Sequence, residues 1–126
     1  MKLEQVHHVA VIGSNMERSR HFYVDLLGFR VIRETFRPER NDIKIDLQLQ
    51  NLQLELFIMK DPPKRVTHPE ACGLRHLAFR VDSVEKTVQE LNALGIMTEP
   101  IRTDSLTGEK MTFFFDPDGL PLEIRE

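Results

Sequence analysis

An internal repeat constrains the fold of this chain more than any other feature of its sequence. The stretch HHVAVIGSNMERSRHFYVDLLGF aligns with RHLAFRVDSVEKTVQELNALGI and places His8 opposite His76, 68 positions later. The same offset relates Glu55, in LQLELF, to Glu123, in PLEIRE. Each glutamate therefore follows its histidine by 47 residues. Two halves with matching positions predict a duplicated unit, and because each half is short, we expect it to share a core with the other half or with a partner.

Each half of the repeat is typical of a strand, a helix and three further strands. In the first half, Ser14 followed by Glu17 forms a capping box that predicts a helix start, and Gly28 is suited to end that helix. In the second half, Asp82 or Ser83 precedes a helical pattern of apolar residues. The expected strands cover residues 6–12, 29–35, 43–49 and 52–58, then 74–81, 97–102, 110–115 and 122–125, with helices at about 14–27 and 84–94.

Alternation gives four of these strands, 6–12, 52–58, 74–81 and 122–125, one apolar face and one face that carries a single His or Glu near the strand middle. In LELF and LEIR, apolar residues flank a glutamate on both sides, so the acid faces away from the side that a helix covers. The sequence predicts an α+β fold in one domain over residues 1–126. Two βαβββ modules, at about 5–59 and 74–126, are expected to form a cupped, mostly antiparallel sheet with the helices outside. The linker between them, residues 60–73, contains three prolines.

Four side chains of the metal-ligand type occupy the polar faces, namely His8, Glu55, His76 and Glu123. Two imidazoles and two carboxylates suit a divalent ion such as Zn²⁺, Ni²⁺, Co²⁺ or Mn²⁺, and a cation would offset the cost of burying two carboxylates. Taken singly, each residue is more often structural or solvated than a ligand. Only the equal spacing of the two pairs favours a metal centre. His7 is expected on the opposite face of its strand from His8, as a structural or edge-exposed residue.

Composition and charge narrow the possible partners. The chain has 126 residues, 40% of them hydrophobic, and a net charge of −3, which lacks the basic character of surfaces that bind nucleic acid. No apolar run approaches the roughly 18 residues of a membrane span, and the start MKLEQVHH is unlike a signal peptide. A single cysteine, Cys72, excludes an intrachain disulfide and fits a reducing compartment. We therefore expect a cytoplasmic protein that binds a small molecule and neither nucleic acid nor a membrane.

The sequence resembles the vicinal oxygen chelate superfamily, which includes bleomycin resistance proteins and dioxygenases, and in particular its glyoxalase I (lactoylglutathione lyase) branch. The likeness covers essentially the whole chain and is carried by HHVAV, ERSRHFYVDLLGF, LELF, LRHLAFRVD and FFFDPDGLPLEI. These motifs are more specific for the superfamily than for any one reaction. The resemblance implies two βαβββ modules around one metal ion, with His8, Glu55, His76 and Glu123 in the four ligand positions.

The resemblance also implies a metal-dependent lyase or isomerase. In glyoxalase-like enzymes the ion, commonly Ni²⁺, Co²⁺ or Zn²⁺, binds two adjacent oxygens of a small substrate and stabilises an enediolate, while a glutamate moves a proton between neighbouring carbons. Glu123 is the favoured base and Glu55 its symmetry-related rival. Arg80 and Arg125, on the faces of His76 and Glu123, are candidates either for binding a substrate carboxylate or for ion pairs at the rim.

Several alternatives stay open within the superfamily. Glu55 stands where epimerases usually carry Gln, and it also distinguishes the chain from extradiol dioxygenases and fosfomycin thiol transferases, which use two His and one Glu. Ile12 stands where bacterial glyoxalase I-like chains commonly carry an Arg that helps hold glutathione, so glutathione is less expected than the metal. The alternatives are a non-catalytic drug or metabolite-binding protein and an Fe²⁺-dependent extradiol-type dioxygenase. Family members of this length are usually homodimers, with sites either within one chain or between subunits.

Overall fold

The computed structural model describes all residues from 1 to 126. The chain divides into two compact units, residues 1–63 and 64–126, which we call module one and module two. The division falls inside residues 60–73, the stretch expected to be a linker. Each unit contains one copy of the sequence repeat, so the repeat is structural as well.

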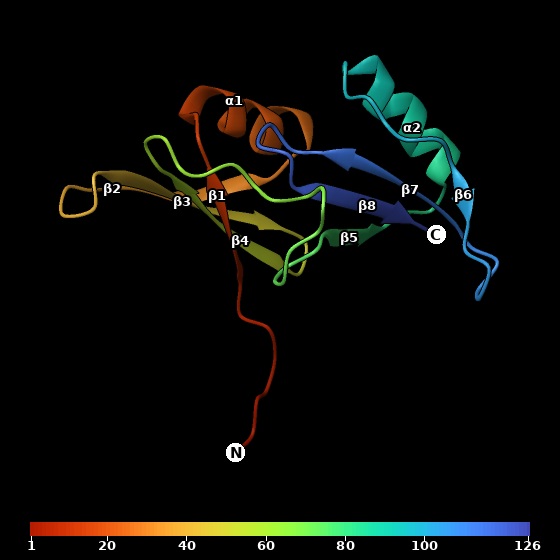
Figure 1. Ribbon diagram of the computed structural model, residues 1–126, viewed down its shortest axis with the longest axis horizontal. Helices are drawn as coiled ribbons and strands as arrows, with labels where there is room; N and C mark the ends of the chain where they lie inside the picture. Colours follow the sequence, from red (N-terminus) through yellow and green to blue (C-terminus); the bar gives the residue numbers. More distant parts are fainter. The chain divides into compact units, whose positions relative to one another are not determined.

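Module one contains a mixed four-stranded sheet (Figure 1). Its strands lie in the order β1-β4-β3-β2, with β1 parallel to β4 and the other two pairings antiparallel. The order makes direct neighbours of the first and last strands of the module, which are far apart in the sequence. The elements in chain order are β1 (Val9–Gly13), α1 (Met16–Arg20), η1 (His21–Leu26), β2 (Arg30–Arg37), β3 (Asp42–Leu49) and β4 (Leu52–Ile58).

Module two repeats this topology with a shorter edge strand. Its strands lie in the order β5-β8-β7-β6, with β5 parallel to β8 and the other two pairings antiparallel. The elements in chain order are β5 (Leu77–Arg80), α2 (Val84–Ala93), β6 (Arg102–Thr103), β7 (Lys110–Phe115) and β8 (Pro121–Arg125). The α+β class and the two βαβββ modules are thus confirmed.

Helix α1 begins one residue later than the capping box predicted. Its N-cap is Asn15, whose Oδ1 accepts a hydrogen bond from the backbone N–H of Arg18 at 2.9 Å. The prediction that Ser14 caps the helix was therefore wrong, and Asn serves as well as Ser in that role. The helix continues as the π-helix η1, and the chain leaves it through Gly28 at a φ of 79°. A positive φ favours glycine there, as the sequence predicted.

Helix α2 follows its prediction closely. Ser83 is the N-cap, and its Oγ accepts a hydrogen bond from the backbone N–H of Lys86 at 3.3 Å. Gly95 follows the helix with a φ of 80°. The two caps, Asn15 and Ser83, are 68 positions apart, so the repeat extends to the residues that start each helix.

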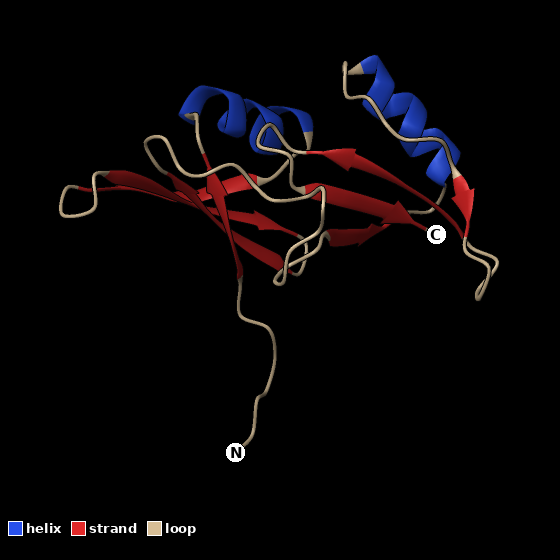
Figure 2. Ribbon diagram, in the orientation of Figure 1, coloured by secondary structure: helices blue, strands red, loops and turns tan.

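The core of each module lies between its helix and the apolar face of its sheet (Figure 2). In module one, Leu54 and Leu56 of β4 are completely buried, and Tyr23 of η1 is 1% exposed. In module two, Leu122 of β8 and Val84 of α2 are completely buried. The alternating apolar residues therefore pack under the helices, which leaves the opposite face of each sheet for polar side chains.

The second of the four strands expected in module two is mostly absent. Residues 97–102 were predicted as a strand, but β6 covers only Arg102 and Thr103. Pro100 lacks the N–H that a strand interior needs, and the carbonyl of Glu99 accepts a hydrogen bond from the Thr112 hydroxyl at 2.7 Å instead.

None of the helices has the length and apolar character that a bilayer crossing requires.

Candidate metal centre

The first His–Glu pair, His8 with Glu55, lies on the polar face of module one. His8 comes immediately before β1 and Glu55 lies within the parallel neighbour β4, in register with Ala10. The contact between the two side chains places His8 on the same face as Glu55. His8 Nε2 is 3.4 Å from Glu55 Oε2, and the side chains are 37% and 13% exposed. We call these residues the module-one pair.

The second pair, His76 with Glu123, repeats this arrangement in module two. His76 comes immediately before β5, and Glu123 of β8 is in register with Ala78. His76 Nε2 is 2.9 Å from Glu123 Oε2, and the side chains are 25% and 5% exposed. The structure therefore brings together each His–Glu combination that the sequence predicted within a module. The histidines precede their strands, however, whereas mid-strand positions were expected. We call these residues the module-two pair.

A lysine holds the second carboxylate oxygen of Glu55. Lys44 Nζ lies 2.8 Å from Glu55 Oε1 and 3.2 Å from Asp46 Oδ1. Asp46 is buried and also accepts a hydrogen bond from Arg33 Nε at 3.3 Å. The hydrogen bond to Glu55 raises the pKa of the Lys44 ammonium, with a further contribution from Asp46. Glu55 is thereby fixed with Oε1 toward Lys44 and Oε2 toward His8.

An arginine has the corresponding role in module two. Arg125 Nη1 donates to Glu123 Oε1 at 3.3 Å, while its Nη2 reaches Glu109 Oε2 at 2.9 Å and Asp104 Oδ2 at 3.2 Å. Hydrogen bonds to Glu109 and then Asp104 raise the pKa of the Arg125 guanidinium. The prediction that Arg125 shares a face with Glu123 is confirmed, and its contacts are ion pairs.

Sequence reasoning missed Lys44 and Asp46. They alternate along β3 on the same face as Glu55, and Asp46 is in register with Glu55. In module two the residue in register with Glu123 is Phe113, whose ring packs edge-on against His76 with 5.3 Å between centroids. The two His–Glu pairs thus have different surroundings, polar in module one and partly aromatic in module two.

The geometry of each pair fits two neighbouring ligands of one divalent ion. With bonds of about 2.1 Å, adjacent ligand atoms are about 3.0 Å apart around an octahedral ion and about 3.4 Å apart around a tetrahedral one. The observed separation between imidazole nitrogen and carboxylate oxygen is 3.4 Å in module one, which equals the tetrahedral value, and 2.9 Å in module two, just below the octahedral value. No three His, Cys, Asp or Glu side chains of residues 1–126 form a metal-holding group, and each module supplies two candidate ligands.

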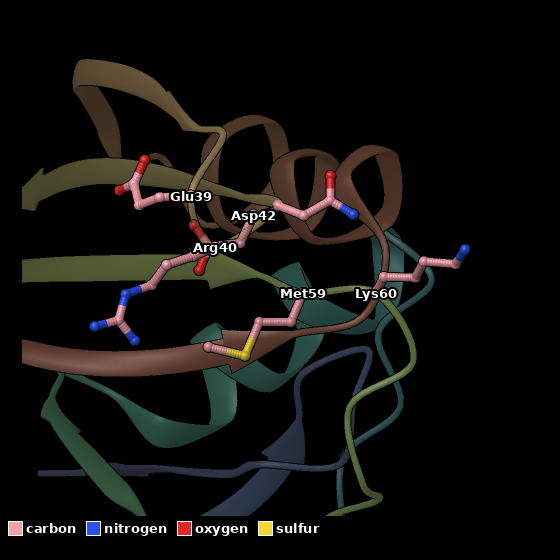
Figure 3. Close-up of a pocket in the computed structure, with 6 residues that line it drawn as sticks. Glu39, Arg40, Asp42, Met59 and Lys60 are labelled. Carbon is pink, nitrogen blue, oxygen red and sulfur yellow. The ribbon is translucent and has the colours of Figure 1, made fainter.

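A hollow elsewhere in module one does not contain the module-one pair (Figure 3). Asp42, one of its acids, accepts two hydrogen bonds from Arg37, at 2.7 and 2.5 Å, which lower the pKa of the Asp42 carboxyl. The two acids of the hollow balance its two cations, so it offers no set of free ligands. The lining residues are Glu39, Arg40, Asn41, Asp42, Met59 and Lys60.

Two βαβββ modules with equivalent polar faces define the class of protein, the paired-module architecture of the vicinal oxygen chelate fold. The model of the Glyoxalase/Bleomycin resistance protein/Dioxygenase superfamily matches residues 5–124. Because this match spans nearly the whole chain, the protein belongs to that superfamily.

Similar proteins extend over the full chain. The uncharacterized protein YwkD of Bacillus subtilis (strain 168) is 59% identical, over 100% of this chain and 99% of its own length. The uncharacterized protein YaeR of Escherichia coli (strain K12) is 47% identical, over 98% and 97%. The crystal structure of a glyoxalase family protein from Enterococcus faecalis is 56% identical, covers 100% of both chains and has a TM-score of 0.96.

More distant relatives in the superfamily carry names that specify reactions. They include methylmalonyl-CoA epimerase of Mus musculus, 29% identical over 71% of this chain and 53% of its own length, and Glyoxylase I 4 of Arabidopsis thaliana, 26% over 98% and 71%. Metallothiol transferase FosB of Staphylococcus saprophyticus is 27% identical over 97% and 76%. The fosfomycin resistance protein FosX of Listeria monocytogenes, solved with Mn(II), shares the fold with a TM-score of 0.74 at 14% identity over 98% and 93%. Superfamily members therefore include metal-binding enzymes of several reaction types.

Proposed function

We propose that the protein is a metal-dependent, glyoxalase-like lyase or isomerase. The observation that supports this most is the repetition of one geometry, in which a histidine Nε2 faces a glutamate Oε2 across parallel strands in both modules. His8, Glu55, His76 and Glu123 are the proposed ligands of one divalent ion, Ni²⁺, Zn²⁺, Co²⁺ or Mn²⁺. The module-one pair and the module-two pair, from one chain or from two, would hold the ion together.

The chemistry follows from the ligand set. A divalent ion bound here would act as a Lewis acid toward a small substrate with two adjacent oxygens and make the neighbouring C–H acidic. The glutamates then have different roles. Glu55 stays fixed by Lys44, whose Nζ is 2.8 Å from its Oε1. Glu123 accepts the proton from one carbon and returns it to the next, so the reaction is balanced without an external oxidant or reductant.

The contacts of the two acids support Glu123 as the base. Its only cationic partner, Arg125, approaches at 3.3 Å and is itself bound to two other acids. The cation contact of Glu123 is thus longer than that of Glu55, which Lys44 restrains at 2.8 Å, and Glu123 is the acid proposed to reorient during turnover. General base catalysis by a positioned carboxylate contributes a factor of about 10²–10⁴ to the rate.

Glutathione is not part of the proposal. Ile12, at the position where glutathione-using relatives of the glyoxalase I branch are expected to carry an arginine, is 52% exposed on the polar side of β1. An exposed apolar side chain there offers no charge to a glutathione carboxylate. We propose a substrate with adjacent oxygens and no obligatory thiol.

Proton exchange into candidate substrates tests the catalytic proposal. Protein loaded with Ni²⁺ or Zn²⁺ is incubated with 2-hydroxyketones and dicarbonyls, with and without thiols, in deuterated buffer and followed by NMR. We expect metal-dependent deuterium incorporation that falls by at least about 10²-fold in Glu123→Gln. Glu90→Gln, an exposed change on α2, is the matched control and keeps full activity. Unchanged exchange in Glu123→Gln would remove that residue from the mechanism.

A non-catalytic binding protein is the second candidate. One observation favours it: Glu55 and Glu123 each have a cation of the chain beside them, so neither charge requires a metal. Under this alternative, small molecules bind without turnover and without dependence on added metal. Binding measured by calorimetry in the presence of a chelator, together with no exchange in any substrate, would select it.

We also propose that the protein is a homodimer. Strand β2 is at one edge of its sheet, and it exposes Phe36 by 61% and Ile32 by 47%. Apolar side chains on an edge strand are suited to a second subunit. Sedimentation analysis of the protein and of Phe36→Glu measures this, and a monomeric wild-type protein would exclude the homodimer.

A further inference from the structure

The residue before each candidate histidine contacts the ring nitrogen that faces away from the glutamate. In module one, His7 Nδ1 is 2.9 Å from His8 Nδ1. In module two, Arg75 Nη1 is 3.3 Å from His76 Nδ1. His7 and Arg75 are 68 positions apart and are thus equivalent in the repeat. The expectation that His7 faces away from His8 was wrong, since both residues precede β1 and strand alternation does not apply to them.

In module one this contact is compatible with metal binding by His8. Of two neutral imidazole nitrogens at hydrogen-bond distance, one carries the proton and the other accepts it. A histidine that binds a metal through Nε2 carries its proton on Nδ1 and donates it to an acceptor. His7 Nδ1 is such an acceptor when the proton of its own ring lies on Nε2. His8 can therefore keep Nε2 free of a proton, and its distance of 3.4 Å from Glu55 Oε2 is longer than an N–H···O hydrogen bond.

In module two the contact has the opposite direction. An arginine guanidinium has only donors, so His76 Nδ1 accepts from Arg75, and the ring proton lies on Nε2. That N–H donates to Glu123 Oε2 at 2.9 Å, a normal hydrogen-bond length. Glu70 stabilises the arrangement, since its Oε1 accepts from Arg75 Nε at 2.8 Å. The atom of His76 that would bind a metal is thus occupied by a proton.

We propose that the residue before each histidine sets how readily that histidine accepts a metal ion. His7 is a positioning residue that prepares His8 for a cation at Nε2. Arg75 holds His76 in the other tautomer, so metal binding by the module-two pair requires Arg75 to withdraw and the ring proton to move to Nδ1. This inference rests on the proposed function for its metal, whereas the two tautomers follow from the hydrogen bonds alone.

Exchanging the two residues tests the proposal through metal affinity. Co²⁺ and Zn²⁺ titrations by calorimetry are compared for the wild-type protein, Arg75→His and His7→Arg. We expect Arg75→His to bind about tenfold more tightly and His7→Arg about 10–100-fold more weakly, as for other residues that orient metal ligands. His21→Arg adds the same charge to module one at an exposed histidine bound to Asp25 and is expected to leave affinity unchanged.

Two further variants separate the hydrogen bond from the charge. Arg75→Met removes the cation without supplying an acceptor, whereas Arg75→Gln removes it and supplies one. We expect Arg75→Gln to bind more tightly than Arg75→Met. Equal affinities in these two variants, or no change in Arg75→His and His7→Arg, would overturn the proposal.

The tautomers are measured directly in the metal-free protein. Long-range ¹H–¹⁵N correlation spectra identify which nitrogen of each imidazole carries the proton. We expect the Nε2–H tautomer for His76 in the wild-type protein and the Nδ1–H tautomer in Arg75→His. A wild-type His76 with its proton on Nδ1 would contradict the inference. A protein that binds no metal but shows the expected spectra would sink the proposed function and not the tautomer assignment.

Discussion

Module one and module two have the same His–Glu pair and hold it with different side chains. In module one the glutamate is fixed by an ammonium from a neighbouring strand, Lys44 on β3, which Asp46 anchors in turn. In module two it is held by a guanidinium on its own strand, Arg125, at a longer distance. The comparison shows that duplication preserved the backbone positions of the candidate ligands but not the neighbours that tune them. Equivalent positions can therefore have unequal roles.

The buried leucines beside the glutamates test whether the modules are equivalent as scaffolds. Leu54 and Leu122 are 68 positions apart and both completely buried. Leu54→Ala and Leu122→Ala are each expected to lower the free energy of unfolding by about 3 kcal/mol, because each leaves a cavity under its helix. Urea unfolding measures both. Costs that differ by more than about twofold would show that the two cores are not packed alike.

The helix caps provide a smaller test of the same equivalence. Asn15 and Ser83 each accept a hydrogen bond from a backbone N–H in the first turn. Asn15→Ala and Ser83→Ala are each expected to cost about 1 kcal/mol of unfolding free energy. Asn15→Ser and Ser83→Asn are the controls and should be nearly neutral. A neutral Asn15→Ala would mean that the short helix α1 depends on packing alone.

The smallest expected effect is a loss of stability in acid, to which carboxyls of both modules contribute. Arg37 lowers the pKa of Asp42 in module one. In module two Lys110 lowers the pKa of Glu85, and the backbone N–H of Leu106 with Arg125 lowers that of Asp104. A carboxyl whose pKa is lower in the folded protein stabilises it above the unfolded value and loses that contribution as pH falls.

The corresponding pH window follows from these directions. The ordinary values are 3.8 for Asp42 and Asp104 and 4.5 for Glu85, so stability should be constant down to about pH 5 and then decline. Asp104→Asn and Asp42→Asn should each flatten the decline measured by urea unfolding at several pH values. A decline as steep in Asp104→Asn as in the wild-type protein would contradict the assigned role of Asp104.

Much of this structure could be predicted from the repeat and from alternation. The bounds of β4 and β7 agree with the predicted strands, and the spacing of His8, Glu55, His76 and Glu123 anticipated which residues meet within each module. Both signals are local and periodic. The extent of β6 was predicted wrongly, because Pro100 interrupts residues 97–102 and the strand covers only Arg102 and Thr103.

The neighbours of the pairs escaped prediction for a different reason. Lys44 and Asp46 look like solvated residues on an ordinary strand, and only the pairing of β3 with β4 places them beside Glu55. His7 and Arg75 come just before a strand, where the alternation of side chains between two faces does not apply, so their contacts could not be predicted from it. Such contacts depend on cross-strand register and on the direction in which each segment of the chain enters its sheet. The spacing of residues in the sequence specifies neither of these.

Metal content per chain tests most directly whether the two pairs form one centre. Purified wild-type protein, His8→Ala, His76→Ala and the double variant are loaded with Zn²⁺ or Ni²⁺, desalted and analysed for bound metal by elemental analysis. One ion per chain in the wild-type protein, lost equally in each single variant, is the expected result, because removing either histidine disables a shared site. A wild-type protein without metal, or a single variant that retains a full complement, would contradict a centre built from both modules.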